Sequence, residues 1–293
     1  MTGSLILVGT PIGNLGDLSP RAVEVLASAG IIYCEDTRHS RKLLTHAGIS
    51  GVALRSLHEH NEDERVDQVV KAVNGGATVA VVSDAGMPGI SDPGSRLVAA
   101  VARAGLPVSV VPGPSAVLAA LVVSGLPTER FCFEGFLPRS GKERRHRMEA
   151  VAGDVRTTVV FEAPGRVAAT LGDLAVACGS GRPVAVVREL TKLHEEVWRG
   201  SLGDAVVWAE GGVRGEVVLV VGGRPDEGDP AVDDGVLATA VAERMAAGER
   251  TRGAVDAVAA AFGVSRRRVY ELALVARDAP SASPSGAGAE GRA

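Results

Sequence analysis

The sequence predicts an α/β protein with two α/β domains and mostly parallel sheets, followed by a small helical domain. Three observations support this prediction. Short runs of Val, Ile and Leu alternate with amphipathic stretches along most of the chain. The runs lack the polar alternation of a half-exposed strand, so each strand should be covered on both faces. The chain has 293 residues, which is enough for two such domains and one further element.

The first predicted domain spans residues 1–125. Ser19 followed by Pro20 has the pattern of a helix N-cap and first helical position, which predicts a helix to about Ala29. A second helix should open at Asn61, because acidic residues follow it and suit the positive end of a helix dipole. Four buried strands are expected, at residues 5–8, 31–34, 78–82 and 108–111.

The second predicted domain spans residues 126–224, and residues 126–136 should connect the two halves. Its strands are expected at residues 157–161, 183–187 and 216–221. Residues 225–234 are rich in Pro, Gly and Asp, which indicates a linker.

A compact helical domain is predicted over residues 235–278. Between residues 254 and 274, an Ala-rich helix, a turn at Gly263 and a further helix capped by Ser265 follow one another. This order is typical of a helix-turn-helix. Residues 279–293 are mostly Ser, Pro, Gly and Ala and are expected to be disordered.

Composition narrows the classes of function. Aromatic residues make up only 3% of the chain, which argues against the base-stacking platforms of single-strand RNA binders. Cys34, Cys132 and Cys178 are odd in number and widely spaced, which suits a reducing cytoplasm. The N-terminus lacks the regions of a signal peptide, and no apolar run approaches the length of a membrane span. A cytoplasmic protein without a membrane partner is therefore expected.

The net charge is −4, so any contact with nucleic acid must use local basic patches. Arg266, Arg267 and Arg268 stand at a predicted helix start, where positive charge opposes the helix dipole, so an anionic partner would explain them. A second basic stretch contains Arg139, Lys142, Arg144, Arg145, His146 and Arg147. For both patches a solvated charged face is the alternative.

Three loops rich in Gly or Pro follow strands of the first domain, at the end of the sheet where open α/β proteins bind ligands. Residues 9–16 can expose backbone N–H groups, although their glycine spacing is not the dinucleotide fingerprint and a tight turn is the alternative. Residues 83–94 hold Asp84, a candidate acceptor for a ribose or amino group, and Asp92, which suits a helix cap because a proline follows it. Residues 112–116 open a helix that could hold a polar ligand or simply be capped.

Polar clusters follow two further predicted strands, one containing Glu35, Asp36 and Arg38 and the other containing Arg188, Glu189 and Lys192. His58 and His60 could bind a metal ion together with Glu35, but two histidines at this spacing without a clear third ligand more often lie in a solvated polar loop. No metal site is therefore predicted. Ser115 lacks the nucleophile-elbow pattern, and no Ser-His-Asp arrangement can be defended.

The strand-end motifs together resemble one family. In order they are GTPIGNLGDLSPRA, EDTRHSRKLL, LHEHNE, SDAGMPGISDPG, PGPSA, RFCFEGFLPR, RELTKLHEE and GEVVLVV. This set resembles the RsmI-type 16S rRNA (cytidine-2′-O)-methyltransferases, which belong to the tetrapyrrole-methylase-like class of S-adenosylmethionine (SAM) enzymes. The resemblance covers about residues 4 to 223, and the C-terminal helices are similar to the small helical domain of that family. Met87 departs from the pattern, because a Thr is expected there, which puts a side-chain hydroxyl contact in doubt but not the backbone contacts.

The resemblance implies a SAM-dependent homodimer that methylates the ribose 2′-hydroxyl of a decoding-centre cytidine in the 16S rRNA of the 30S subunit. It implies a cofactor cleft between the two α/β domains, lined by Pro11, Asp84, Ala85, Gly86, Met87, Ser115, Ala116, Ala163 and Glu216. Because a 2′-hydroxyl is a poor acid, a base or a nearby cation should help remove its proton, and a lysine of lowered pKa could be that base. The candidates are Glu35, Asp36, Glu189 and Lys192. The candidate RNA contacts are Arg38, Arg144, Arg145, Arg188, Arg266, Arg267 and Arg268.

Two alternatives remain open at the level of sequence. A small-molecule methyltransferase, acting for example on a tetrapyrrole, would share this fold, because a fold does not decide the substrate. A DNA-binding regulator would use the helix-turn-helix and keep the α/β part as a ligand sensor. Labelled methyl transfer to 30S subunits or to uroporphyrinogen tests the first alternative, and a shift assay with duplex DNA tests the second.

Overall fold

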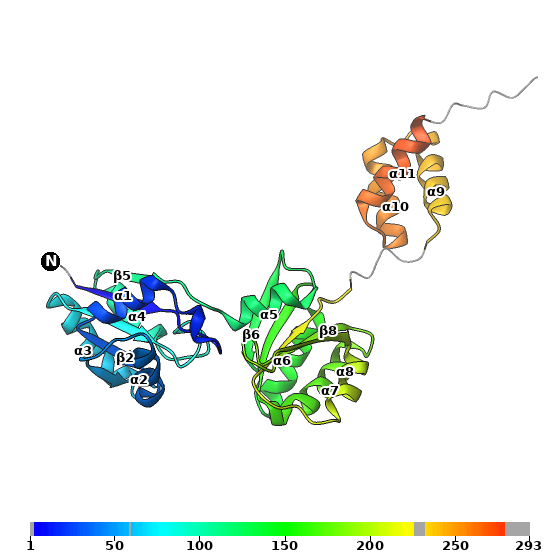
Figure 1. Cartoon of the computed structure of the whole chain (residues 1–293). Coiled ribbons are helices and arrows are strands. Elements are labelled where there is room, and N and C mark those ends of the chain that lie inside the picture. Colours follow the sequence, from blue (N-terminus) through cyan, green and yellow to red (C-terminus); the bar gives the residue numbers. More distant parts are fainter. Residues whose placement is uncertain (1–2, 59, 226–231, 279–293) are drawn as a thin grey trace, which may run out of the picture. The chain divides into compact units, whose positions relative to one another are not determined.

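The computed structural model describes residues 3–58, 60–225 and 232–278, coloured along the chain in Figure 1. The chain divides into two compact units, Met1–Arg224 and Pro225–Ala293. The larger unit contains two five-stranded sheets.

The first sheet has the strand order β3-β2-β4-β1-β5, and every neighbouring pair of strands is parallel. Its strands are β1 (Ser4–Val8), β2 (Ile31–Cys34), β3 (Leu54–Ser56), β4 (Thr78–Val82) and β5 (Val108–Val111). Its helices are η1 (Leu15–Asp17), α1 (Pro20–Ser28), α2 (Thr37–His46), α3 (Glu62–Asn74) and α4 (Ser95–Arg103). The predicted strands and the helix starts at Pro20 and after Asn61 are confirmed, whereas the three-residue β3 was not predicted.

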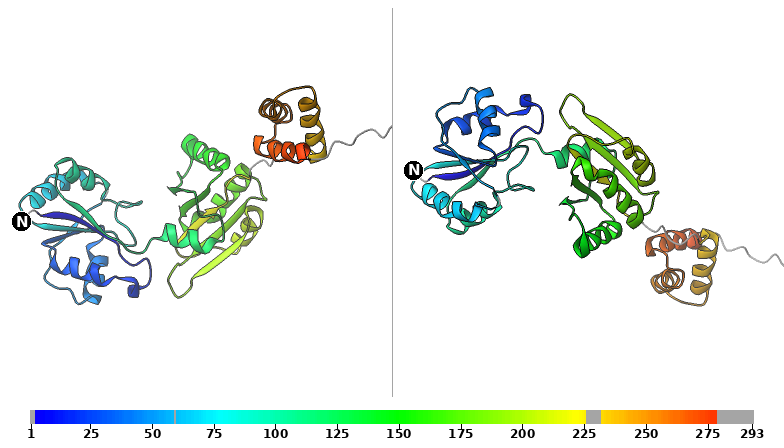
Figure 2. Two further views of the ribbon diagram at one scale, coloured as in Figure 1. Left: turned by 90° about the horizontal axis from the view of Figure 1, so that it is seen from above. Right: turned by 90° about the horizontal axis from the view of Figure 1, so that it is seen from below.

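Both faces of the sheet are covered at β1, β2 and β4, as the continuous apolar runs predicted. The prediction of a buried strand is wrong for β5, because this edge strand is exposed at Val108 and Val110. Ile32 and Cys34 on β2 pack with α1 and α2, while their neighbour Tyr33 packs on the opposite face with α3 and α4. The left panel of Figure 2 shows the two blue helices on one face of the sheet and the two cyan helices on the other. A strand buried on both sides needs apolar residues at every position, which is why its sequence does not alternate.

The second sheet has the strand order β6-β7-β10-β8-β9. Its strands are β6 (Phe131–Phe136), β7 (Thr157–Glu162), β8 (Pro183–Arg188), β9 (Glu196–Ser201) and β10 (Val217–Val221). Its helices are α5 (Ala116–Ser124), α6 (Gly141–Gly153), η2 (Pro164–Arg166), α7 (Val167–Cys178) and α8 (Leu202–Ala209). α5 covers one face, and α6, α7 and α8 cover the other.

The prediction of a mostly parallel sheet is wrong for this second domain. Only β6 and β7 are parallel, and the pairs β7-β10, β10-β8 and β8-β9 are antiparallel. The apolar runs in β7, β8 and β10 report that both faces are covered, and helices can cover an antiparallel sheet equally well. The structure also places β6 inside the predicted connection of residues 126–136, and it adds the edge strand β9.

The smaller unit is a three-helix bundle in its described part, residues 232–278. Its helices are α9 (Asp234–Ala246), α10 (Thr251–Phe262) and α11 (Arg266–Asp278). Gly263 ends α10 in a left-handed conformation, with φ of 67°, and the Ser265 hydroxyl accepts a hydrogen bond from the Arg268 N–H at 3.4 Å. The turn and the cap lie where the sequence predicted them. Most of the predicted linker (residues 226–231) and all of the predicted disordered tail (residues 279–293) lie outside the described residues.

Candidate functional site: a cavity at the strand ends

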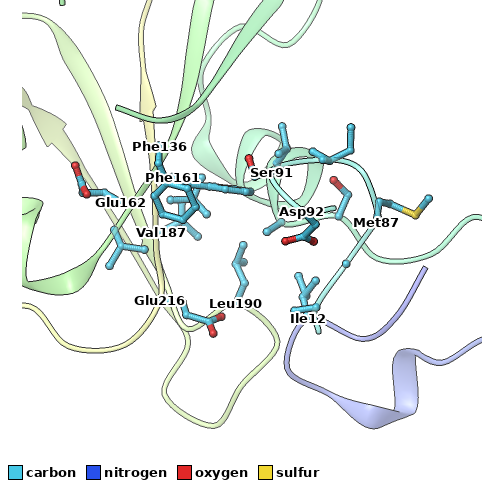
Figure 3. Close-up of a pocket in the computed structure, with 18 of the residues that line it drawn as sticks. Ile12, Met87, Ser91, Asp92, Phe136, Phe161, Glu162, Val187, Leu190 and Glu216 are labelled. Carbon is cyan, nitrogen blue, oxygen red and sulfur yellow. The ribbon is translucent and has the colours of Figure 1, made fainter. Parts of the chain in front are cut away.

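A cavity of about 390 Å³ lies where loops of the first domain meet strands of the second (Figure 3). Of the residues predicted to hold the cofactor, all except Pro11 line this cavity, and Ile12 lines it next to Pro11. The loops at the ends of the first sheet also contribute Asp84, Ala85, Gly86, Met87, Ile90, Ser91, Asp92 and Ser115. α5, which packs on the second sheet, contributes Ala116 and Val117. The second domain contributes Phe136, Phe161, Glu162, Ala163, Pro164, Val187, Leu190, Glu216, Val217 and Val218. The volume is in the range of small-molecule sites.

Backbone contacts hold the first-domain loops together at one end of the sheet. The Thr10 N–H donates to the Gly86 carbonyl at 2.9 Å, and the Gly86 N–H donates to the Thr10 carbonyl at 3.2 Å. A Cβ on Gly9 would lie 2.7 Å from the Gly113 backbone, so neither glycine tolerates a side chain. The glycines after β1 and β5 therefore allow three loops to converge on one point.

An apolar wall faces these loops from the second domain. The rings of Phe136 and Phe161 pack edge to face with centroids 5.6 Å apart, beside Val187 and Leu190. Figure 3 shows the Glu162 carboxylate turned away from this wall. That carboxylate is nearly fully buried and accepts a hydrogen bond from the Thr170 hydroxyl at 2.6 Å. The wall therefore presents aromatic and aliphatic surface, which suits a flat heterocycle.

Carboxylates gather on the first-domain side of the cavity. Asp84 accepts a hydrogen bond from the Asp36 N–H at 3.1 Å, which ties the end of β2 to the end of β4. Burial raises the pKa of Glu35, and the negative charges of Asp84 and Asp36 raise it further. Hydrogen bonds from the backbone and side chain of Arg38 lower the pKa of Asp36, so this carboxylate is a helix cap and a poor base.

Asp92 does not cap the helix that follows it, contrary to the prediction from sequence. α4 begins at Ser95 rather than after Asp92, and its cap comes from Glu62, whose Oε1 accepts hydrogen bonds from the N–H groups of Gly94 and Arg96, both at 2.9 Å. Asp92 is therefore free to line the cavity, and its carboxylate faces Leu190 in Figure 3. Burial, followed by the nearby charge of Glu35, raises the pKa of Asp92 to about 6. A signal for this role was present in the sequence. The loop of residues 83–94 contains two carboxylates, Asp84 and Asp92, although the helix that follows needs only one cap.

The turn after β8 brings a second charged group to the cavity. Glu189 accepts hydrogen bonds from the Lys192 ammonium at 3.0 Å and from the Glu216 N–H at 2.9 Å, and the Lys192 ammonium lies 3.0 Å from the Glu216 carboxylate. Glu189 and Thr191 both adopt left-handed backbone conformations, with φ of 52° and 64°. Such conformations cost free energy in residues other than glycine and concentrate at functional sites.

Lys192 cannot serve as a base in this arrangement. Partial burial lowers its pKa, but hydrogen bonds to Glu189 and Glu216 outweigh burial, so the net pKa of Lys192 is raised. The expectation of a lysine with a lowered pKa is therefore wrong, because two carboxylates stabilise the ammonium. A Cβ on Gly13 would lie 2.5 Å from the Lys192 Cγ, so the loop after β1 packs directly against this turn.

Comparisons with known proteins agree with this architecture. The family model of the tetrapyrrole (corrin/porphyrin) methylases matches residues 4–206. The protein named ribosomal RNA small subunit methyltransferase I from Mycobacterium tuberculosis is 49% identical over 278 residues, which is 94% of this chain and 96% of that protein. The protein of the same name from Synechocystis sp. is 43% identical over 273 residues, covering 93% and 98% of the two chains.

The chain belongs to the ribosomal RNA small subunit methyltransferase I family. Solved structures of lower identity support the fold. A diphthine synthase superposes with a TM-score of 0.58 at 15% identity, covering 75% of this chain and 89% of its own. A uroporphyrin-III C-methyltransferase from Thermus thermophilus, in complex with S-adenosyl homocysteine, superposes with a TM-score of 0.52 at 22% identity, covering 75% and 97%.

The cavity fits SAM, the methyl donor of this methyltransferase family, by its chemistry. The apolar wall of Phe136 and Phe161 suits an adenine ring, and the carboxylates of Asp84 and Asp92 suit ribose hydroxyls and a cationic sulfonium. Met87, the departure from the family pattern, keeps its backbone at the cavity. Its sulfur packs on the Gly9 turn, and its side chain points away from the apolar wall in Figure 3.

The arginines predicted to contact RNA differ in burial and in whether they are already paired with a carboxylate. Arg144 does not belong to an RNA surface, because it is nearly buried and donates to Asp173 at 2.7 Å and to the Pro138 carbonyl at 2.8 Å. Arg188 pairs with Glu196, and Arg38 pairs with Asp36 at 3.4 Å. Arg145 is exposed on α6.

The three arginines at the start of α11 need no outside anion. Arg266 pairs with Asp256 of α10, Arg267 with Glu271 of α11, and Arg268 with Asp234 of α9. Acidic groups of the same bundle therefore offset the positive charge that opposes the dipole of α11. The dipole of α11 therefore does not require an external anionic partner, contrary to the prediction from sequence. An RNA contact at these arginines stays a prediction.

Residues 3–58, 60–225 and 232–278 contain no group of three or more His, Cys, Asp and Glu side chains arranged to hold a metal ion. None of the helices in these ranges combines the length and apolar character that a bilayer crossing requires.

Proposed function

We propose that this protein methylates the ribose 2′-hydroxyl of a decoding-centre cytidine in 16S rRNA, with SAM as the methyl donor. The observation that carries the proposal is a cavity suited to SAM whose rim bears a carboxylate, Asp92, that can change protonation near neutral pH. Support for the substrate comes from relatives named ribosomal RNA small subunit methyltransferase I, one of which is 49% identical over 94% of the chain.

Bound SAM would supply a methyl group already activated by the positive sulfonium. The remaining task of the protein is to orient the 2′-hydroxyl and accept its proton, since a ribose hydroxyl is a poor acid. Asp92 is the preferred base, because a carboxylate with a pKa of about 6 is ionised at neutral pH yet more basic than an ordinary aspartate. Glu35, whose pKa is also raised, is the second candidate and lies nearer to solvent.

The other three candidates take supporting roles in this proposal. Lys192 remains a cation beside Glu216 at the cavity and can attract the negative charge that develops on the ribose oxygen. Glu189 positions Lys192. Asp36 caps α2 and holds its loop against Asp84.

The substrate is proposed to be rRNA within the 30S subunit, and the working form a cytoplasmic homodimer. Exposed apolar surface supports the dimer. Val108 and Val110 are 37% and 47% exposed on β5, the edge strand of the first sheet, and Leu118 and Val122 are 52% and 69% exposed on α5. An unpaired strand edge with exposed valines is a surface that a second copy would cover.

Transfer of a labelled methyl group from SAM tests the proposal. The acceptors are 30S subunits and naked 16S rRNA from a strain that lacks this protein, with uroporphyrinogen as the small-molecule comparison. We expect label in the rRNA alone, at a cytidine ribose located by mass spectrometry. Label in uroporphyrinogen alone, or no affinity for SAM by calorimetry, would reject the proposal.

The same assay tests the role of Asp92. Asp92→Asn should retain SAM binding and lose at least about 100-fold in the rate of methyl transfer, which is the usual contribution of a general base. Asp67→Asn, on the exposed side of α3, is the matched control and should keep the wild-type rate.

A further inference from the structure

α2 carries a basic groove that the proposed chemistry does not use. Arg38, Arg41, Lys42, Thr45 and His46 line a shallow hollow on this helix. Their spacing of three and four residues places them on one helical face, while Leu43 and Leu44 on the opposite face are buried in the first domain. The helix is therefore anchored by its apolar face and presents a cationic stripe to solvent.

Much of the positive charge of this groove is not neutralised by the protein. Arg41 and Lys42 are both exposed, and neither forms an ion pair within the described residues. Arg38 pairs with Asp36, but its side chain is 88% exposed. The three arginines at the start of α11, like Arg38, each pair with an acidic side chain, whereas Arg41 and Lys42 do not in the described part of the chain. In a protein of net charge −4, such a stripe is a local site for an anion.

The groove begins at the edge of the cavity. Asp36, the N-cap of α2, donates its N–H to Asp84, which lines the cavity. Arg41 follows Asp36 by five residues, which is about 7.5 Å along the helix axis. The carboxylates at the cavity repel phosphate, whereas the stripe attracts it. A strand with its ribose in the cavity would therefore be drawn with its flanking phosphates onto α2.

We propose that the α2 groove binds the phosphate backbone of single-stranded rRNA next to the target ribose, with Arg41 and Lys42 each neutralising a phosphate. This inference rests on the proposed function, because it needs RNA as the substrate. Phosphate contacts place a strand in register without reading its bases, so base selection falls to the cavity. The groove would serve chiefly to hold the substrate.

The test is the salt dependence of RNA binding. The double variant Arg41→Gln with Lys42→Gln is compared with wild type and with the control Lys71→Gln with Arg103→Gln, which removes two exposed cations from α3 and α4. Binding of a fluorescent 16S rRNA fragment is measured by anisotropy over a series of KCl concentrations. Loss of two phosphate contacts on a single strand should reduce the slope of log K against log[salt] by about 1.4. The control variant should keep the wild-type slope, and SAM affinity by calorimetry should stay at the wild-type value in both variants.

The outcomes separate this inference from the proposed function. Wild-type slope and affinity in the α2 variant would overturn the groove as an RNA site, even if the wild-type protein methylates rRNA. An equal loss of slope in the control variant would also overturn it, because the effect would then follow net charge. Failure of the wild-type protein to methylate rRNA would instead reject the proposed function.

Discussion

Replacement of Asp92 by Asn should make the protein more stable at neutral pH while it lowers the rate of methyl transfer at least about 100-fold. The pKa of Asp92 rises from 3.8 to about 6 on folding, chiefly through burial, so the folded state resists ionisation of this carboxyl. A pKa that is higher by about 2 units in the folded state corresponds to about 3 kcal/mol of folding free energy. The Asp92 side chain keeps partial contact with water, so we expect Asp92→Asn to gain only half of that free energy, about 1.5 kcal/mol.

The pH window follows from the direction of the shift. Well below pH 3.8 the Asp92 carboxyl is protonated in both the folded and the unfolded state, so it costs no folding free energy. As pH rises towards about 6, the unfolded state loses its proton first, so the wild-type protein loses stability, and above about pH 7 the penalty is constant. Asn cannot ionise, so the advantage of Asp92→Asn should grow between about pH 4 and 6 and then level off.

Thermal unfolding of the two proteins from pH 4 to pH 8 measures this advantage. In a domain of this size about 1.5 kcal/mol raises Tm by about 3 to 6 °C, and that gain should appear at pH 8 and shrink at pH 4. Asp67→Asn, whose carboxyl is exposed on α3, is the control and should show no such pH-dependent gain. A Tm difference that is absent at pH 8, or equal at every pH, would refute the reasoning that Asp92 is held against its ionisation.

Three further outcomes are expected. Asp84→Ala should weaken SAM binding about tenfold or more in calorimetry, since it removes a cavity carboxylate and the acceptor that holds the loop after β2; an unchanged Kd would count against Asp84 as a cofactor contact. Arg144→Met should lower the free energy of unfolding in urea by about 1 to 3 kcal/mol, because the Thr170 hydroxyl and the Pro138 carbonyl lose their donor. The salt slope of RNA binding should stay at the wild-type value, and a changed slope would place Arg144 on the RNA surface. Glu62→Gln should cost about 1 to 2 kcal/mol in the same unfolding assay, because a neutral amide caps α4 less well than a carboxylate; no loss would mean that the cap contributes little.

The fold was largely predictable because its signals are local. The four long strands of the first sheet and the helix cap at Ser19 are each encoded by a few adjacent residues. β3 and β9 escaped prediction, because one has three residues and the other is a polar edge strand, so neither forms an apolar run. Strand direction in the second sheet also escaped, because a run such as β10 records only that helices cover both of its faces.

The site was predictable in outline for a different reason. Parallel strands bring their carboxyl ends to one edge, so loops separated by about 30 to 100 residues in the chain could be assigned to one site. The roles of individual site residues were harder to predict from the sequence, because they depend on contacts with residues far away in the chain. Asp92 was taken for a cap because Glu62, 30 residues earlier, was not known to supply it. Lys192 was considered as a base because its contact with Glu216 was not visible.

The sequence by itself determined where the strands and helices lie, which loops meet at the strand ends and which family the chain resembles. These are properties of short segments and of their order, which the chain carries without folding. Only the tertiary structure decided which carboxylate is held back from ionisation, which arginines are already paired and which cations of α2 remain exposed. Charge and burial act through space, so the neighbours that folding brings together decide the pKa of a residue and whether its charge is paired.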